Sequence, residues 1–231
     1  MRCQSSGPTM DIMKWDAPVL AAPTSVVVAS DAASEEITLL AGRMAETMRS
    51  VGGLGIAANQ VGVPLRLFVM ELPDVVSAGG HIEGAEAFIN PEVVARCGQH
   101  LGHEGCLSFP GLFLPTLRPA EVTLAWEAPG GMLQQRRFAD PLAAMVICHE
   151  CDHLDGRPFF EHLPETARAV ADPFLQKLTR EWEGRRAVSP AQYCAERDLG
   201  GLPPAVSWEL ERLVREFMRR VPAPEDSCAE A

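Results

Sequence analysis

The sequence predicts an α+β fold with a helical C-terminal extension. Three observations support this fold class: short strand-like segments fill the middle of the chain, a well-delimited helix follows them, and charged helical patterns come last. The 231 residues suffice for one large domain, or for one medium domain with an appendage. We therefore expect a main domain of residues 1–164 and a helical C-terminal extension of residues 165–231, with a disordered tail at 222–231.

Charge and composition exclude several classes of function. Lys and Arg number 20 against 31 Asp and Glu, a net charge of −11, which argues against DNA or another phosphate backbone as the main partner. No segment approaches the roughly eighteen unbroken apolar residues that a membrane span needs, and the N-terminus lacks the apolar core of a secretory signal. We therefore expect a cytoplasmic protein without a membrane partner, whose seven cysteines stay reduced.

The first predicted helix covers Glu35 to Ser50. Its apolar residues recur at helical spacing: Ile37, Leu40, Ala41, Met44 and Met48. Ser34 is a suitable N-cap, and the glycines of residues 51–55 end the helix in a tight loop.

Several short segments then predict strands. They are Leu65 to Leu72, Ala87 to Ile89, Val93 to Cys97, Glu121 to Trp126 and Met132 to Phe138. We expect the second to stop at Asn90-Pro91, and the last two to form a hairpin through the loop of residues 128–131.

The clearest helix begins after Asp140 and ends at Asp155-Gly156. It carries the pattern HExxH, which places His149 and His153 four residues apart on one helix face. Both imidazoles can bind one metal ion, and Glu150 can contact a water bound to that ion.

The pattern HExxH alone does not select an enzyme class. One extended peptidase pattern continues HxxGxxH, which the chain follows as far as Gly156, but Phe159 stands where the third histidine ligand would be. Cys106, far upstream, is the best candidate for the third ligand, although a single cysteine is more often simply buried. A thiolate and two imidazoles leave the fourth position of a tetrahedral site open to water, as hydrolysis requires.

Three segments of the chain together resemble the peptide deformylase family. They are residues 53–60 (GLGIAANQ), residues 104–108 (EGCLS) and residues 149–156 (HECDHLDG). They occur in the family's order, and the resemblance covers roughly residues 11 to 164. It implies a fold of antiparallel strands around the HExxH helix, and a metal-dependent hydrolase that removes the N-formyl group from the formyl-methionine of newly made proteins.

The resemblance also implies roles for individual residues. It assigns the metal ligands to Cys106, His149 and His153, proton transfer to Glu150, and oxyanion binding to the Gln60 amide and the Leu107 backbone N–H. The implied ion is divalent, with Fe²⁺ favoured and Zn²⁺, Ni²⁺ or Co²⁺ as substitutes. Glu104 is expected to orient its loop through a hydrogen bond outside the set of metal ligands.

The substrate methionine requires apolar walls. The residues that the family alignment offers for this pocket are Leu54, Leu142, Met145 and Val146, each equally explicable as ordinary core. Gly55, like Gly53, lets the main chain bend so that Gln60 approaches the metal.

Two departures from the family keep other functions open. In some family members an Arg in the loop after EGCLS contacts the backbone of the substrate peptide. The corresponding position here is Phe113. The residue before the first histidine ligand is Cys148 instead of the usual Gln. A related amidohydrolase acting on another formamide or small amide is therefore an alternative. A non-catalytic relative is a third reading, against which the intact Glu150 and Gln60 argue.

The extension contains an amphipathic helix at Ser207 to Arg220. One face carries Leu210, Leu213, Val214 and Phe217, and arginines gather toward its end at 212, 215, 219 and 220. We expect this helix either to pack on the main domain or to make a transient contact with the ribosome.

Overall fold

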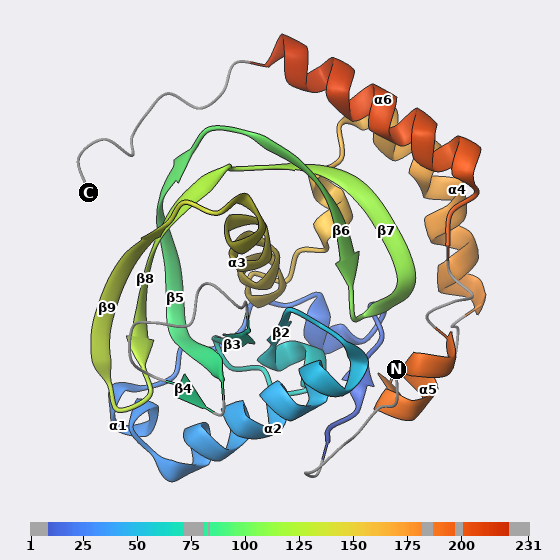
Figure 1. The fold of residues 1–231 in the computed structure, drawn as a ribbon. Helices are drawn as coiled ribbons and strands as arrows, with labels where there is room; N and C mark the ends of the chain where they lie inside the picture. The colour runs from blue at the N-terminus through green and yellow to red at the C-terminus, as the bar shows by residue number, and fades with distance from the viewer. Residues whose placement is uncertain (1–8, 72–80, 83, 182–186, 197–200, 222–231) are drawn as a thin grey trace.

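Helix α3 (Pro141–Leu154) runs through the middle of the molecule, and long strands curve around it (Figure 1). The computed structural model describes residues 9–71, 81–82, 84–181, 187–196 and 201–221. The expected tail at 222–231 and the end of the predicted strand at Leu72 lie outside these ranges. Within them, no helix combines the length and the apolar character that crossing a bilayer would take.

The remaining helical elements lie on either side of α3 along the chain. They are η1 (Pro18–Leu20), α1 (Ala29–Ala32), α2 (Glu35–Val51), η2 (Ala58–Val61), η3 (Phe159–His162), α4 (Glu165–Glu181), α5 (Pro190–Glu196) and α6 (Pro204–Arg220). The strands are β1 (Ile12–Met13), β2 (Gly55–Ala57), β3 (Leu67–Met70), β4 (His81–Ile82), β5 (Ala85–Cys97), β6 (His100–Cys106), β7 (Phe109–Arg118), β8 (Glu121–Ala128), β9 (Met132–Phe138) and β10 (Ala187–Val188).

The strands form one antiparallel sheet and two antiparallel pairs. The sheet has the order β2-β3-β5-β8-β9, with β4 added beside β5, while β6 pairs with β7 and β1 with β10. An aromatic cluster on the sheet, formed by Phe68, Phe88, Trp126 and Phe138, packs against the apolar face of α3. This confirms the predicted α+β architecture around the HExxH helix.

The predicted helix ends are confirmed in detail. The Ser34 side chain accepts a hydrogen bond from the Ile37 N–H at 3.3 Å, and α2 ends at Gly52, which has a left-handed φ of 75°. At α3, Asp140 Oδ1 accepts from the Ala143 N–H at 2.8 Å. Pro141 takes the first helical position of α3, where its missing N–H costs nothing.

The predicted stop at Asn90-Pro91 is wrong, because β5 continues through both residues. Asn90 has a φ of 50°, and the pairing of β5 with β8 shifts register between Ile89 and Glu92. Such a bulge accommodates a proline, which cannot donate a ladder hydrogen bond. The Asn90 side chain further stabilises the bulge by bonding both the N–H and the carbonyl of Val27, at 2.9 and 2.8 Å.

Other elements were absent from the prediction. The β6–β7 hairpin was missed, although its end carries Cys106, and the stretch expected as a loop before residue 207 contains β10 and α5. The last helix, α6, begins at Pro204, upstream of the predicted Ser207.

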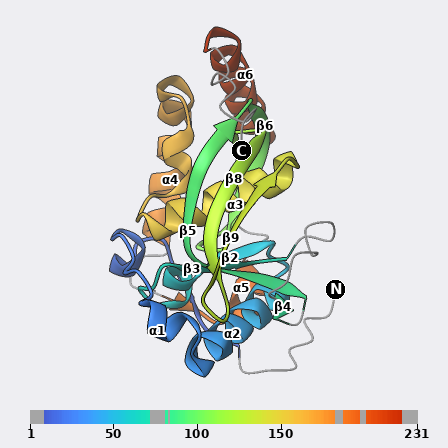
Figure 2. The ribbon, with the colours of Figure 1, turned by 90° about the vertical axis from the view of Figure 1, so that its left-hand side faces the viewer.

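The C-terminal helices pack on the β6–β7 hairpin. Leu210 and Val214 of α6 are fully buried, in one cluster with Leu114 of β7 and Leu175 of α4. Seen from the side (Figure 2), α4 and α6 lie at one end of the molecule and α1 and α2 at the other. The division of the chain at residue 164 stays a prediction.

Candidate active site

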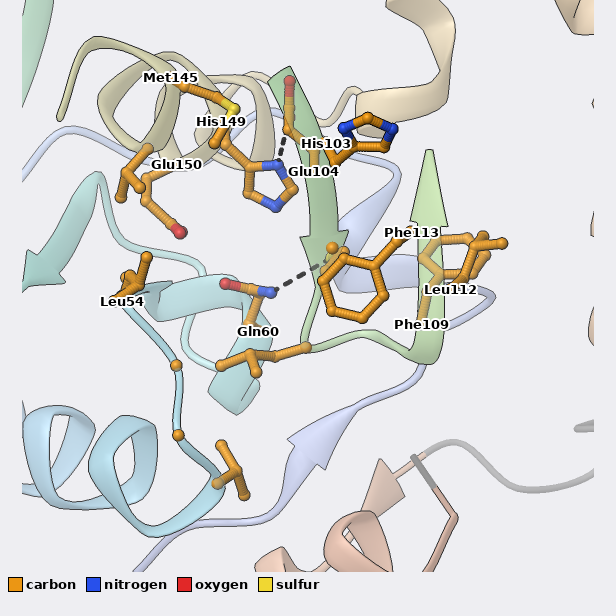
Figure 3. A pocket seen from close by; sticks show the side chains of 18 of the residues that line it. Leu54, Gln60, His103, Glu104, Phe109, Leu112, Phe113, Met145, His149 and Glu150 are labelled. Atoms are coloured by element: carbon orange, nitrogen blue, oxygen red, sulfur yellow. Dashed lines mark hydrogen bonds and ion pairs between the residues drawn. The ribbon is translucent and has the colours of Figure 1, made fainter. Parts of the chain in front are cut away.

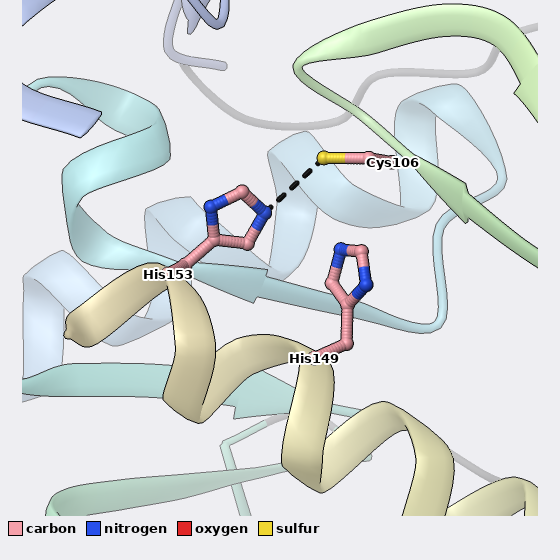
Figure 4. A group of neighbouring side chains, drawn as sticks. All are labelled: Cys106, His149 and His153. Atoms are coloured by element: carbon pink, nitrogen blue, oxygen red, sulfur yellow. Dashed lines mark hydrogen bonds between the residues drawn. The ribbon is translucent and has the colours of Figure 1, made fainter. Parts of the chain in front are cut away.

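Three side chains suited to hold one metal ion meet between α3 and β6. His149 and His153 lie one turn apart on α3, with ring centroids 4.9 Å apart, and Cys106 is the last residue of β6. Cys106 Sγ is 3.1 Å from His153 Nε2, and the ligand atoms of all three lie within 4.8 Å of one another (Figure 4). The structure thus brings together the three residues predicted as ligands.

The surroundings of Cys106 favour the thiolate, which is the form that binds metals. Burial alone would raise the pKa of its thiol, but positive charge on His153 and hydrogen bonds from both histidines outweigh burial and lower the pKa to about 5. Cys148 differs, because its burial raises the pKa to about 11. A thiolate with two imidazoles is a donor set that fits a single divalent transition metal ion.

Glu104 fixes the orientation of His149 from outside the ligand group. Its Oε2 is 2.8 Å from His149 Nδ1, as Figure 3 shows. Burial opposes ionisation of Glu104, but hydrogen bonds from Arg118 and His149 lower its pKa to about 2. Because an ionised carboxylate only accepts hydrogen bonds, Nδ1 carries a proton, which leaves Nε2 as the ring nitrogen that would bind a metal ion.

A buried arginine, which the sequence analysis missed, joins this carboxylate to α3. Arg118 Nε and Nη2 donate to the two oxygens of Glu104 at 2.6 and 2.9 Å, and Nη1 donates to Asp152 Oδ2 at 2.6 Å. Thr116 also donates to Glu104. Asp152 lies between the two histidine ligands in sequence, so this network ties the ligand helix to β6 and β7. No sequence motif marked Arg118, which ends a strand that was not predicted.

Gln60 points its amide nitrogen toward the ligand group. The Ala57 N–H donates to Gln60 Oε1 at 2.8 Å, which leaves Nε2 to face Cys106 Sγ at 3.7 Å and Ser108 Oγ at 3.3 Å (Figure 3). The neighbouring Asn59 donates to the backbone carbonyl of His153 at 2.5 Å. Residues of the glycine-rich segment therefore contact both the cysteine and the histidine part of the site.

Glu150 lies beside the ligand group and is buried. Burial raises the pKa of its carboxyl to about 7, against the opposing charges of His149 and His153. Among the described residues, none forms a hydrogen bond with Glu150 Oε2. A Cβ atom at Gly55 would lie 2.6 Å from Glu150 Oε1, so the glycine provides the space that this carboxylate occupies.

Five of these residues border one cavity of about 480 Å³: Gln60, Glu104, Cys106, His149 and Glu150. Its apolar lining includes every residue predicted for the methionine pocket: Leu54, Leu142, Met145 and Val146. Gly55 and Leu107, also predicted, line the cavity as well. Phe113 borders it from β7 and is 59% exposed, so the position that is Arg in some family members carries an apolar ring at the rim.

Comparisons with known proteins agree with this site. The family model "Polypeptide deformylase" matches residues 9–169. A peptide deformylase of Alkalilimnicola ehrlichii is 36% identical over 176 residues, covering 74% of this chain and 92% of that protein, and peptide deformylase 2 of Xanthomonas campestris is 33% identical over 171 residues, covering 74% and 96%.

Solved structures give the same result. The crystal structure of peptide deformylase from Thermus thermophilus has a TM-score of 0.65 at 32% identity, and the match covers 74% of this chain and 96% of that one. The peptide deformylase from Synechococcus elongatus, in complex with actinonin, has a TM-score of 0.64 at 29% identity, covering 74% and 89%. This chain belongs to the peptide deformylase family.

Proposed function

We propose that this protein hydrolyses the N-formyl group of N-terminal formyl-methionine on newly made proteins and releases formate. The observation that carries the proposal is the position of Glu150. Its buried carboxyl group borders the same cavity as Cys106 and His149, two of the three proposed metal ligands, and no described residue engages one of its oxygens. A proton-transfer group beside a metal-ligand set is what amide hydrolysis requires.

The bound ion supplies Lewis acidity and lowers the pKa of water at the site toward neutrality. Among the divalent ions that the donor set fits, we propose Fe²⁺, with Zn²⁺, Ni²⁺ or Co²⁺ as substitutes. Cys106, His149 and His153 would hold it, and Glu104 would keep the His149 ring in the orientation and tautomer that binding needs.

Glu150 would move the protons of the reaction. It takes a proton from the attacking water as the water oxygen bonds to the formyl carbon, and gives it to the methionine nitrogen as the carbon–nitrogen bond breaks. Burial raises the pKa of this carboxyl group above its ordinary value, toward the range in which a group both accepts and returns a proton near neutral pH.

Gln60 and Leu107 would stabilise the negative charge that develops on the formyl oxygen. A hydrogen bond from the Ala57 N–H orients the side-chain amide of Gln60. Leu107, which would donate its backbone N–H, directly follows the ligand Cys106 in the sequence. Loss of one such donor typically raises the barrier by about 2.7–4 kcal/mol.

The methionine side chain would enter the apolar part of the cavity. Leu142, Met145 and Val146 border this part from α3, and Leu54 borders it from the loop after α2. The thioether of methionine fits such flexible apolar walls.

The test is formate release from formyl-Met-Ala-Ser by protein loaded anaerobically with Fe²⁺. Glu150→Ala should lower kcat by about 10²- to 10⁴-fold without loss of the bound ion. Glu92→Ala, which removes an exposed carboxylate on β5, is the matched control and should be fully active.

No formate release by wild-type protein containing one ion per chain would contradict the proposal. The same protein should then be tested on formylated small molecules, since hydrolysis of another formamide or small amide is the alternative that Phe113 supports.

We also propose that the protein works in the cytoplasm and that α6 transiently contacts the ribosome. The described part of α6 has four arginines and three glutamates, and Arg212, Arg215 and Arg220 each pair with a glutamate of the same helix. Such pairing weakens attraction to RNA, so a contact would rely on Arg219 and on the exposed Trp208.

Arg219→Glu should reduce co-sedimentation with ribosomes at low salt while turnover of free peptide stays constant.

A further inference from the structure

One residue that borders the active-site cavity comes from beyond the family match. The match ends at residue 169, whereas Tyr193 lies on α5. Its side chain nevertheless lines the cavity together with Gln60, His149 and Glu150, and is 7% exposed. The C-terminal extension thus supplies part of the wall around the reacting groups.

Several contacts hold α5 in this position. Strand β10, just before it, pairs with β1 in the register Ile12 to Val188. The Ser189 hydroxyl accepts from the Gln192 N–H at 3.4 Å and so begins α5, and Cys194 Sγ donates to the Ser50 carbonyl at the end of α2 at 3.7 Å. Helix α5 is therefore fixed both to the N-terminal strand and to α2.

Tyr193 borders the cavity beside the C-terminal end of α2. It shares an apolar cluster with Val51, the last residue of α2, and with Leu107. Met145 and Glu150, by contrast, reach the cavity from α3, across from Leu54 (Figure 3). Between Val51 and Leu54 the wall of the cavity consists of Gly52 and Gly53. Neither residue has a side chain that could cover the ring of Tyr193.

We infer that Tyr193 contacts the residues that follow methionine in the substrate, and so makes the enzyme favour peptides over formyl-methionine alone. The inference rests on the proposed function. If methionine occupies the α3 side and its formyl group lies at the ligand group, the rest of the peptide must leave the cavity past another wall. A buried aromatic ring offers that peptide a rigid apolar contact at little entropic cost.

Kinetics with two substrates test this specificity. Tyr193→Ala should raise KM for formyl-Met-Ala-Ser about tenfold at nearly unchanged kcat, and should leave kcat/KM for formyl-methionine amide unchanged. Tyr193→Phe keeps the ring and should keep the wild-type ratio of kcat/KM between the two substrates. The control is Leu133→Ala, which removes an 80% exposed apolar side chain from β9 and should alter the kinetics of neither substrate.

Equal losses on both substrates in Tyr193→Ala would overturn the inference, since the residue would then only support the site. A wild-type protein that cleaves neither substrate would instead refute the proposed function. The two failures are therefore distinguishable.

A second measurement does not depend on whether Tyr193→Ala folds. Tyr193 is the only tyrosine of the chain, so 3-fluorotyrosine labelling gives a single fluorine resonance. In metal-loaded Glu150→Ala protein, this resonance should shift on addition of formyl-Met-Ala-Ser and much less with formyl-methionine amide. A resonance that stays in place while calorimetry records saturation by the tripeptide would overturn the inference.

Discussion

Two arginines in this protein make nearly the same bonds in opposite surroundings. Arg118 bridges Glu104 and Asp152 with bonds of 2.6 to 2.9 Å, and Arg212 of α6 bridges Glu209 and Glu216 with bonds of 2.7 to 3.1 Å. The Arg118 side chain is 3% exposed, whereas that of Arg212 is 58% exposed. Distances alone therefore do not distinguish the two networks.

The two networks differ in how well the remaining carboxylates would be solvated if the arginine were removed. Water replaces the lost partner of an exposed charge, so an exposed ion pair contributes little to stability. Glu104 and Asp152 are buried, and no water can replace Arg118 without rearrangement of the protein. The buried network also bonds a metal ligand, His149, so its integrity affects chemistry as well as stability.

The largest effect on stability is expected from Arg118→Met. This change leaves the buried Glu104 without its arginine, whereas Asp152 keeps Arg157 and His162 as partners. Loss of the buried pair should lower the free energy of unfolding by about 3–5 kcal/mol. Urea unfolding at a fixed metal concentration measures this loss, since a bound ion itself stabilises the folded state.

Arg118→Lys is the matched variant for this prediction. Lysine keeps the positive charge but cannot bond both oxygens of Glu104 and also Asp152, so an intermediate loss is expected. A loss in Arg118→Met no greater than at an exposed pair would show that burial does not separate the two networks.

A smaller effect, on metal affinity, is expected from Glu104→Gln. The amide keeps the volume of the side chain but removes the charge that fixes the His149 tautomer and attracts Arg118. Affinity for Zn²⁺ or Co²⁺, measured by competition with a chelator, should fall about 10- to 100-fold.

Glu86→Gln provides the control for Glu104→Gln. Glu86 is also buried and pairs with an arginine, Arg136, at 3.0 Å, but it lies on β5 away from the ligand group. Its loss should leave metal affinity unchanged. An equal drop in both variants would mean that general destabilisation, and not the bond to His149, sets the affinity.

Much of this site was predictable from the sequence because its residues lie in short motifs with fixed spacing. The HExxH helix sets the positions of His149 and His153, and the glycine-rich segment and EGCLS supply Gln60 and Cys106 through resemblance to the family. The cap residues Ser34 and Asp140 marked the helix starts because capping is a local interaction.

The rest depended on contacts between distant segments. Arg118 and Asp152 come together only when β7 packs beside α3, and nothing near either residue in the sequence indicates the other. Strand β5 was divided in two because proline usually ends a strand, and the bulge that accommodates Pro91 relies on Asn90 bonding to Val27. Tyr193 was missed because it lies in no motif. The helix that carries it is held in place by β10, which pairs with the N-terminal strand β1.

The smallest effect is expected from Arg212→Ala, which completes the comparison with Arg118. Its three bonds all go to glutamates of the same exposed helix face, so water can solvate Glu209 and Glu216 once the arginine is gone. The melting temperature should change by about 2 °C or less, and deformylation and metal content should not change. High salt should reduce even this difference, because screening already weakens exposed pairs but not buried ones. A large loss of stability in Arg212→Ala would mean that α6 depends on its surface charges, and not on the buried Leu210 and Val214, for its attachment to the β6–β7 hairpin.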